Sequence, residues 1–260
     1  MNANSVYYIG HEHTICEDYS IAEAYPPSFA FAIVCDGCSA STDVDFGARV
    51  LALSAKRTLK WNDGYSPSEF ANVTIQNAAR VYDVFPALHP QALDATLLAA
   101  WVHNNNLTAY LFGDGVLIHK TKTSVNSIHI QLTSGAPDYL SYSLAPARME
   151  CYKAMKDNKK EVITSINYVI TPEIYEPFYP FIYTCPVEEG DIIAVISDGI
   201  NSFRKADYTP IPWQDLIGEF TGFKTTEGEF VARRISAFKR KCLKEGITHS
   251  DDISIASIIV

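Results

Sequence analysis

The sequence predicts an α+β fold whose sheets are mainly antiparallel. Apolar runs of strand length, rich in β-branched and aromatic residues, follow one another between turn residues. Helical patterns occur in separate blocks and do not alternate with these runs, which disfavours a parallel sheet of strand–helix–strand units. The sequence HNNN at 103–106 indicates a tight hairpin, because asparagine tolerates the positive φ of such turns. The apolar runs lie at 5–10, 29–37, 95–102, 107–115, 127–134, 191–199 and 253–260.

Three segments carry helical patterns. Residues 45–60 repeat alanine and leucine at helical spacing, which predicts one apolar face. Residues 66–84 begin with Ser66 at the position of an N-cap and Pro67 at the first helical position. Residues 226–244 are amphipathic and become basic toward their end, where positive charge favours the helix dipole.

Composition limits the classes of protein that need to be considered. The 260 residues are 47% hydrophobic and 20% charged, which is enough for one substantial core. We expect a single domain over residues 1–260, with an irregular excursion from Pro137 to Pro180 that is rich in tyrosine and proline. The formal net charge is -9 and the pI is ≈ 5.2, which disfavours nucleic acid and anionic membranes as partners.

The sequence also predicts where the protein is found. No apolar run approaches the roughly 20 residues that span a bilayer. Residues 1–14 contain neither a basic stretch nor a long apolar one, which disfavours a signal peptide. The six cysteines are scattered, as in proteins whose thiols stay reduced. We therefore expect a cytoplasmic protein.

A C-x-x-C motif surrounds an Asp-Gly pair and offers two kinds of sulfur chemistry. Cys35 and Cys38 could belong to a zinc site or to a redox pair. A structural zinc site needs about four ligands, and the sequence has no second pair of this kind. A redox pair needs a lowered thiol pKa, which an aspartate inside the loop opposes. We expect Cys35 to pack as a small apolar residue and assign the chemistry to Asp36.

Aspartate followed by glycine ends an apolar run three times, at Asp36, Asp114 and Asp198. Each pair alone is compatible with an ordinary turn. Carboxylates at several strand ends can converge at one edge of a sandwich, where their repulsion is costly unless cations lie between them. Oxygen ligands without histidine suit Mg²⁺ or Mn²⁺ better than zinc. With two further acidic pairs, Glu17-Asp18 and Asp251-Asp252, the pattern predicts a two-metal hydrolytic site.

In this order the motifs resemble those of the type 2C metal-dependent protein phosphatases, the PPM family. The resemblance spans about Tyr8 to Val260, and the order of the motifs makes it more specific than any one of them. The form H-x-x-x-E-D, which begins at His13, is similar to a divergent, largely prokaryotic branch of the family. The matching motifs are CEDYS at 16–20, FAIVCDG at 31–37, Thr96 in DATL, FGDG at 112–115, AVISDG at 194–199 and DDISIASIIV at 251–260.

The resemblance implies a fold and a set of ligands. The fold would be a four-layer α-β-β-α sandwich, in which helices flank two mainly antiparallel sheets and two Mg²⁺ or Mn²⁺ ions lie where the sheets open. Asp36 and Asp198 would be the central catalytic ligands, and residues 138–180 would form a flap beside the site. The resemblance implies that Asp36 serves both ions and that Gly37 contributes its carbonyl. Asp198 and Asp251 would hold the first ion. Glu17 and Asp18 would serve the second, at least one of them through water, and Asp114 would serve a third, weaker ion.

Two positions depart from the family pattern. His13 stands four residues before Glu17, where many members have an arginine, and Cys38 stands where some have a histidine proposed as general acid. We expect His13 to bind the substrate phosphate; the alternative is a histidine that only braces the Glu17-Asp18 turn. Without a histidine after Asp36-Gly37, protonation of the leaving group would fall to metal-bound water.

The resemblance implies a Mg²⁺/Mn²⁺-dependent phosphatase that acts on phosphoserine or phosphothreonine in a protein or peptide. Two ions about 3.5–4 Å apart would activate a bridging hydroxide for in-line attack on phosphorus and would stabilise charge on the phosphoryl oxygens. The alternatives are a pseudophosphatase that only binds and a small-molecule phosphohydrolase on the same fold. The presence of Asp36, Asp198 and Asp251 argues against the pseudophosphatase, because degenerate members usually lose metal ligands first.

Overall fold

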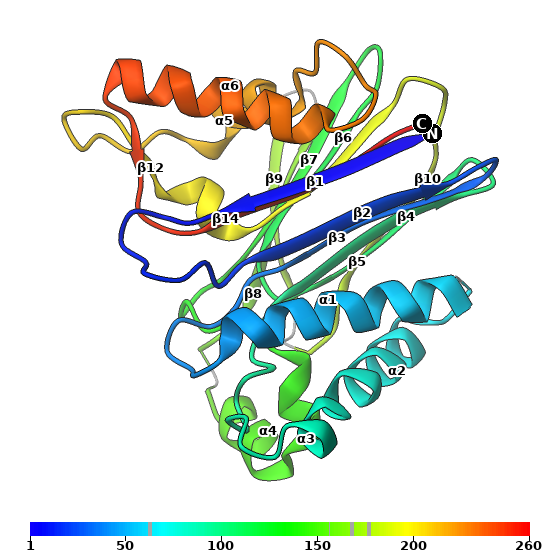
Figure 1. Cartoon of the computed structure of the whole chain (residues 1–260), viewed down its shortest axis with the longest axis vertical. Coiled ribbons are helices and arrows are strands. Elements are labelled where there is room, and N and C mark those ends of the chain that lie inside the picture. The colour runs from blue at the N-terminus through cyan, green and yellow to red at the C-terminus, as the bar shows by residue number, and fades with distance from the viewer. Residues whose placement is uncertain (62–63, 156, 167–168, 176–177) are drawn as a thin grey trace.

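The computed structural model of the chain describes residues 1–61, 64–155, 157–166, 169–175 and 178–260. Two antiparallel sheets pack face to face, and helices cover the outer face of each (Figure 1). The expected α+β fold of four layers, α-β-β-α, is therefore confirmed. None of the described helices combines the length and the hydrophobicity that a bilayer crossing requires.

The larger sheet has seven strands and the smaller one has five. Every neighbouring pair of strands in both sheets is antiparallel. The larger sheet has the order β1 (Asn2–Tyr8), β14 (Ile253–Ile259), β11 (Ile192–Ile196), β6 (Gly115–Lys120), β7 (Val125–Leu132), β8 (Lys160–Ile166) and β9 (Val169–Tyr175). The smaller has the order β10 (Phe181–Pro186), β5 (Asn106–Phe112), β4 (Leu97–His103), β3 (Phe29–Cys35) and β2 (Tyr19–Tyr25). A separate two-stranded ribbon pairs β12 (Phe203–Arg204) with β13 (Thr248–His249).

The helices divide between the two outer faces. α1 (Val44–Trp61) and α2 (Pro67–Ala79) pack on the smaller sheet, whereas α5 (Trp213–Thr221) and α6 (Phe230–Glu245) pack on the larger one (Figure 1). A third apolar cluster fills the space between the sheets. The remaining helical elements are short: α3 (Val81–Val84), α4 (Pro146–Lys153) and the 3₁₀ turns η1 (Leu140–Leu144) and η2 (Asp198–Ser202).

Local sequence preferences account for several element ends. Asn104 and Asn105 both have positive φ, 49° and 60°, so the hairpin expected at 103–106 is confirmed. Ser66 caps α2 through a capping box with Glu69, and Pro67 occupies the first turn as expected.

Two helices differ from the sequence prediction in extent. α2 ends at Ala79, and the short α3 follows it, where one helix to residue 84 was expected. α6 begins at Phe230 and not at residue 226. Gly228 explains the later start, because its φ of +57° is left-handed and incompatible with a right-handed helix.

The irregular excursion expected between Pro137 and Pro180 is only partly correct. Its first part leaves the sheets as η1 and α4, but its second part forms β8 and β9, which extend the larger sheet beyond β7. The sequence pattern failed there because a lysine-rich stretch and Pro172 interrupt an otherwise β-branched run. Residues 156, 167–168 and 176–177 of this excursion lie outside the described residues.

Candidate metal centre

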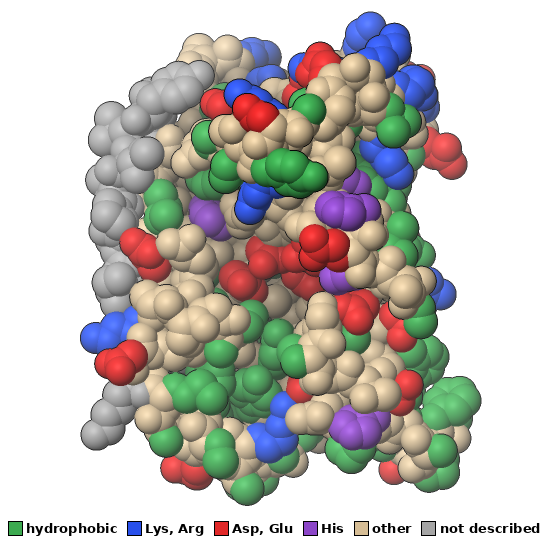
Figure 2. All heavy atoms as spheres, turned by 90° about the vertical axis from the view of Figure 1, so that its left-hand side faces the viewer, with side chains coloured by type: hydrophobic (Ala, Val, Ile, Leu, Met, Phe, Trp, Pro, Cys, Tyr) green, Lys and Arg blue, Asp and Glu red, His purple; other side chains and the backbone are tan. Residues whose placement is uncertain are grey.

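The three Asp-Gly pairs lie at one end of the sandwich. Asp36 follows β3, Asp198 follows β11, and Asp114 occupies the turn between β5 and β6. Burial raises the pKa of Asp36 well above its ordinary value, and the charges of Asp18, Asp198 and Asp114 raise it further. Figure 2 shows acidic side chains gathered in a hollow in the middle of one face. The expected convergence of these carboxylates is therefore found.

Asp198 interacts electrostatically with every other aspartate of the group. Its charge contributes to the raised pKa values of Asp18, Asp36, Asp114 and Asp251, although burial is the largest cause in each case. The pKa of Asp251 rises to about 6. Mutual repulsion of this kind is expected where carboxylates face one another without an intervening positive charge.

Asp18 has one satisfied and one unsatisfied oxygen. Its side chain is 2% exposed, and Ser197 donates a hydrogen bond of 2.6 Å from Oγ to Oδ2. Ser197 Oγ in turn accepts from the backbone N–H of Ser254 at 2.9 Å. Asp18 Oδ1 is buried and has no hydrogen-bond partner among the described residues. A buried carboxylate oxygen without a donor is suited to a cation.

Backbone contacts hold Asp36 and Gly37 in place. The N–H of Asp36 donates to Thr96 Oγ1 at 3.1 Å, and the N–H of Thr96 donates to the carbonyl of Asp36 at 2.8 Å. Thr96, noted as a family landmark in the sequence, therefore fixes the backbone at Asp36. A Cβ atom at Gly37 would lie 2.9 Å from the carbonyl oxygen of Glu17, so only glycine lets these two segments approach so closely.

The adjacent Asp251 and Asp252 have different environments. Asp252 is 2% exposed and accepts hydrogen bonds from the backbone N–H groups of Gly10 at 2.7 Å and Glu17 at 2.5 Å. The side chain of Asp251 is 41% exposed and lies within the influence of Asp198. Asp251 thus belongs to the carboxylate group, whereas Asp252 anchors the N-terminal loop. The anchoring role of Asp252 was not predicted, and the doubled aspartate at 251–252 is its only sign in the sequence.

His13 lies among three carboxylates of this loop. Its Nδ1 is 3.0 Å from Asp252 Oδ2 and 3.9 Å from Glu17 Oε2, and its Nε2 is 3.6 Å from Asp251 Oδ1. Partial burial alone would lower the pKa of His13, but the close carboxylate of Asp252 and the negative charges of Asp251 and Glu17 raise it overall. His13 is therefore biased toward the protonated form.

Glu17 lies at the rim of the group. Its Oε2 accepts a hydrogen bond of 2.5 Å from Ser39 Oγ. Ligand atoms of His13, Glu17 and Asp252 lie within 4.8 Å of one another, a spacing compatible with a metal ion. Because both oxygens of Asp252 already accept backbone N–H groups, we assign this trio to bracing of the loop.

Asp114 lies beside a buried ion pair that the sequence analysis did not predict. Lys160 Nζ is 2.9 Å from Asp138 Oδ2, and both side chains are 1% exposed. Burial and the charge of Asp198 raise the pKa of Asp114, while the nearby Lys160 lowers it. Asp138 and Lys160 belong to the excursion, so this segment contributes charge next to the carboxylates.

Tyr139 also approaches the carboxylates from the excursion. Its side chain is 6% exposed. Burial raises its pKa far above the ordinary value, and its hydrogen bond with Cys38 and the charge of Asp36 raise it further. Cys38 and Cys35 are both free thiols, and Cys35 is fully buried against α1 as expected. The phenol of Tyr139 therefore lies next to Cys38, a contact that was not predicted from the sequence.

A charged network ties the excursion to the loop before β4. Arg148 forms two hydrogen bonds to the carboxylate of Asp94, at 3.0 and 2.6 Å, and Asp94 also accepts from Ser41 Oγ and Ser141 Oγ. Asp94 is 2% exposed and its carbonyl accepts from the N–H of Cys38 at 2.8 Å. Arg148 thus positions η1 and α4 relative to the Asp36 loop.

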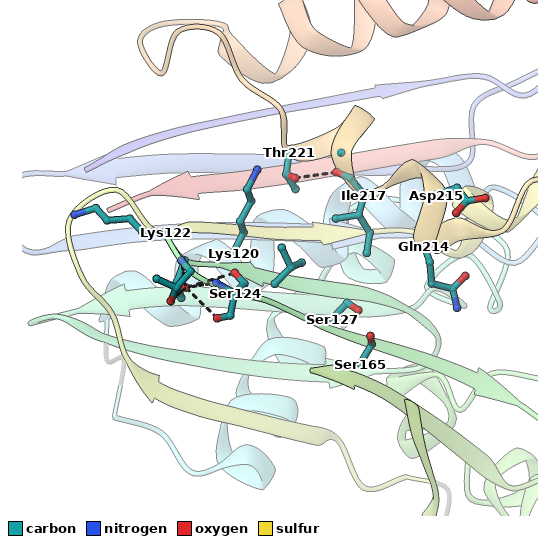
Figure 3. Close-up of a pocket in the computed structure, with 13 residues that line it drawn as sticks. Lys120, Lys122, Ser124, Ser127, Ser165, Gln214, Asp215, Ile217 and Thr221 are labelled. Atoms are coloured by element: carbon teal, nitrogen blue, oxygen red, sulfur yellow. Dashed lines mark hydrogen bonds between the residues drawn. The ribbon is translucent and has the colours of Figure 1, made fainter. Parts of the chain in front are cut away.

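A pocket of about 620 Å³ lies away from the carboxylates, between the β6–β7 turn and α5 (Figure 3). Its lining includes Lys120, Ser127 and Gln214 and none of the acidic residues discussed above. The pocket is therefore separate from the candidate metal centre.

Comparisons with known proteins identify the family and the fold. The family model described as Protein phosphatase 2C matches residues 10–238. No curated protein matches the chain at a significant level. Two solved structures illustrate the fold similarity. A serine/threonine phosphatase of S. agalactiae has 16% identity, a TM-score of 0.59 and coverage of 99% of this chain and 98% of its own. The PPM Ser-Thr phosphatase MsPP of Mycobacterium smegmatis, in complex with cacodylate, has 13% identity, a TM-score of 0.56 and coverage of 100% and 98%.

The match over residues 10–238 covers most of the chain and includes five of the six motifs, all but the one at 251–260. The chain belongs to the protein phosphatase 2C family. The resemblance inferred from the order of the motifs is therefore confirmed.

Proposed function

We propose that the protein is a Mg²⁺/Mn²⁺-dependent phosphatase that hydrolyses phosphoserine and phosphothreonine in proteins or peptides. The observation that carries the proposal is the convergence of five aspartates. The pKa values of four of them are raised, and the charge of the fifth, Asp198, contributes to each of these shifts. Family membership and the named activities of the S. agalactiae and M. smegmatis relatives support the same reaction.

The residues present fit divalent cations. The Oδ1 of Asp18 is buried and has no hydrogen-bond partner in the part of the chain that the structure describes, which leaves it free to act as a ligand. Asp198 and Asp251 would hold one ion, and Asp18 and Glu17 would serve a second. Asp36 would serve both, the carbonyl of Gly37 would be a further ligand, and Asp114 would serve a weaker third ion. Such ions would supply Lewis acidity, which activates a water molecule and stabilises charge on phosphoryl oxygens.

The protein's own groups position the ligands and the substrate. Ser197 orients Asp18, Thr96 fixes the backbone of Asp36, and Asp252 holds the loop that carries Glu17. A protonated His13 at the mouth of this group would donate a hydrogen bond to a phosphoryl oxygen from Nε2, while Asp252 retains Nδ1. His13 would therefore both brace the loop and bind phosphate.

Transfer of the phosphoryl group to water needs a proton donor for the departing alkoxide. Cys38 stands where some members have a histidine proposed as general acid, so the proton for the leaving group would come from water. We place the protein in the cytoplasm, where phosphorylated proteins would be its substrates.

The test is hydrolysis of p-nitrophenyl phosphate with Mn²⁺, with Mg²⁺ and with EDTA, repeated on a phosphothreonine peptide. We expect turnover of both substrates with either cation and none with EDTA. Turnover of p-nitrophenyl phosphate alone would favour a small-molecule phosphohydrolase. Absence of turnover with bound Mn²⁺ would favour a pseudophosphatase and contradict the proposal.

A further inference from the structure

A second cluster of reactive side chains lies at the opposite end of β6 and β11 from the metal centre. β6 begins directly after Asp114 and carries His119 near its other end, and Asp191 directly precedes β11, which Asp198 follows. The five residues from Asp114 to His119 span roughly 17 Å of extended strand. The cluster is therefore distinct from the carboxylate group.

The orientation of His119 is set by a buried carboxylate. His119 Nε2 is 3.1 Å from Asp191 Oδ2, and the two residues are 5% and 4% exposed. The same oxygen of Asp191 accepts the N–H of Glu188 at 3.1 Å. Because an ionised carboxylate only accepts hydrogen bonds, Nε2 of His119 carries the hydrogen and Nδ1 is left as an acceptor.

Nδ1 of His119 faces two side chains of β10, the edge strand of the smaller sheet. Cys185 Sγ lies 3.5 Å away and the hydroxyl of Tyr183 lies 3.2 Å away. Cys185 is a free, half-buried thiol. Burial and the charge of Asp191 raise its pKa, while a hydrogen bond from Tyr183 lowers it. The thiol therefore keeps its proton at neutral pH and needs a base in order to react.

We propose that Cys185 is a modification site for hydrogen peroxide, with His119 as the base that accepts the thiol proton and Asp191 as the residue that orients His119. The three side chains have the relation of nucleophile, base and orienting acid that activates thiols and hydroxyls elsewhere. A thiolate of high pKa is also the more nucleophilic once it forms. Tyr183 lowers the pKa of Cys185, so its hydroxyl would stabilise the charge that develops on the sulfur.

The reaction is balanced by peroxide alone. The thiol proton passes to His119 Nδ1 as the sulfur attacks one peroxide oxygen; the O–O bond breaks and an S–O bond forms. The departing hydroxide takes the proton back from His119 and leaves as water. Cys185 is oxidised by two electrons to a sulfenic acid, and the peroxide is reduced to water.

The test measures sulfenic acid at each cysteine of the whole protein by dimedone trapping and mass spectrometry after brief exposure to hydrogen peroxide. Cys151, which is exposed and has no imidazole partner among the described residues, serves as the internal reference. We expect Cys185 to be labelled at least about tenfold faster than Cys151, because general-base assistance is worth about 10²–10⁴-fold and partial burial offsets some of it. Labelling of Cys185 no faster than Cys151 would overturn the proposal, and this comparison needs no mutation.

Variants then test the role of the base. His119→Gln should reduce labelling of Cys185 to the rate of Cys151, and Asp191→Asn should reduce it by a smaller factor because the hydrogen bond survives without the charge. His89→Gln, in a loop remote from the cluster, is the matched control and should leave the rate unchanged. Folding is checked by circular dichroism. Unchanged labelling of Cys185 in folded His119→Gln would exclude His119 as the base; should that variant unfold, Asp191→Asn and the wild-type ratio decide.

Discussion

The two ends of β6 and β11 differ in how the negative charge of their aspartates is compensated. At one end, Asp114 and Asp198 face further carboxylates, and the nearby Lys160 and His13 offset only part of this negative charge, since the pKa values of Asp114 and Asp251 remain raised. At the other end, Asp191 has His119 and a backbone N–H as partners. We therefore propose that the first end takes up cations from solution, whereas the second is compensated within the chain. The same two strands thus carry a group of incompletely compensated carboxylates at one end and a self-contained hydrogen-bonded cluster at the other.

The largest effect is expected from removing the shared carboxylate. Asp36→Asn should lower metal-dependent turnover by about 10²–10³-fold, because a metal contributes several kcal/mol to the transition state. The variant should stay folded, since asparagine has nearly the same shape. The measurement is kcat with p-nitrophenyl phosphate at saturating Mn²⁺, with Asp215→Asn on the exposed start of α5 as control. Near wild-type turnover in Asp36→Asn would remove the proposed bridging role.

Substitutions at Asp251 and Asp252 should have different effects, one on activity and the other on stability. Asp252→Asn should destabilise the protein by about 2 kcal/mol, because an NH₂ group replaces one of the two carboxylate oxygens, each of which accepts a hydrogen bond from a backbone N–H. Asp251→Asn should instead reduce activity and leave stability unchanged or slightly raised. Urea unfolding in EDTA, paired with kcat in Mn²⁺, measures both. Loss of stability in Asp251→Asn together with loss of activity alone in Asp252→Asn would contradict the assignment of Asp252 as the anchor and Asp251 as the ligand.

The metal-free protein should lose stability as pH rises. The pKa of Asp251 is raised from 3.8 to about 6, and those of Asp18 and Asp36 are also raised, so the folded state binds more protons than the unfolded state. Its free energy of unfolding therefore falls as pH rises from about 4 through 6. Melting in EDTA should show this fall, and Asp36→Asn should raise Tm at pH 7 by about 2–4 °C for each 1 kcal/mol of repulsion relieved.

Saturating Mn²⁺ provides the complementary arm of that experiment. Its stabilising effect should grow with pH, because protons and cations compete for the same oxygens. A melting temperature in EDTA that is constant or rises between pH 4 and 6 would contradict the repulsion inferred for this end of the sandwich.

A smaller effect is expected at His13. His13→Ala should raise KM for a phosphopeptide more than it lowers kcat, and more strongly at lower pH, because the carboxylates favour the protonated ring. His13→Arg should largely preserve KM and flatten its pH dependence, since arginine stays charged. An unchanged KM in His13→Ala across about pH 6–8.5, on either side of the unperturbed pKa, would leave only the bracing role through Asp252.

The smallest effect should follow from loss of the C-x-x-C thiols. Cys35→Ala combined with Cys38→Ser should keep metal-dependent turnover within about an order of magnitude of wild type, because neither sulfur belongs to the carboxylate group. Some stability should be lost, since Cys35 is fully buried. Stoichiometric zinc in the purified protein, lost together with activity in the double variant, would reverse this assignment.

Sequence reasoning recovered the architecture where local chemistry decides the structure. The capped start at Ser66, the Asn104-Asn105 turn and the apolar strands ending in Asp-Gly all follow from side-chain preferences over a few residues. It failed in the excursion, where β8 and β9 form because they pair with β7 and with each other. Strand pairing of this kind depends on partners that are distant in the sequence. The local sequence of a polar or proline-containing strand therefore gives little indication that it forms a strand.

The candidate site was predictable only in part for a similar reason. Repeated Asp-Gly pairs indicated Asp36, Asp114 and Asp198, because each carboxylate ends its own strand. The anchoring of Asp252 to Gly10 joins residues 242 positions apart, and the placement of Tyr139 beside Cys38 depends on how the excursion folds back. Apart from the doubled aspartate at 251–252, neither contact leaves a pattern along the sequence.

The central claim is that the carboxylate end of the sandwich binds divalent cations that the opposite end does not need. It is tested most directly by calorimetric titration of Mn²⁺ into the metal-free protein at pH 7. We predict saturable binding of two Mn²⁺ ions, with a weaker third at high concentration, and a marked loss of affinity in Asp36→Asn. Asp215→Asn should bind as the wild type does. Binding that is absent, or equal in Asp36→Asn and the wild type, would contradict the account.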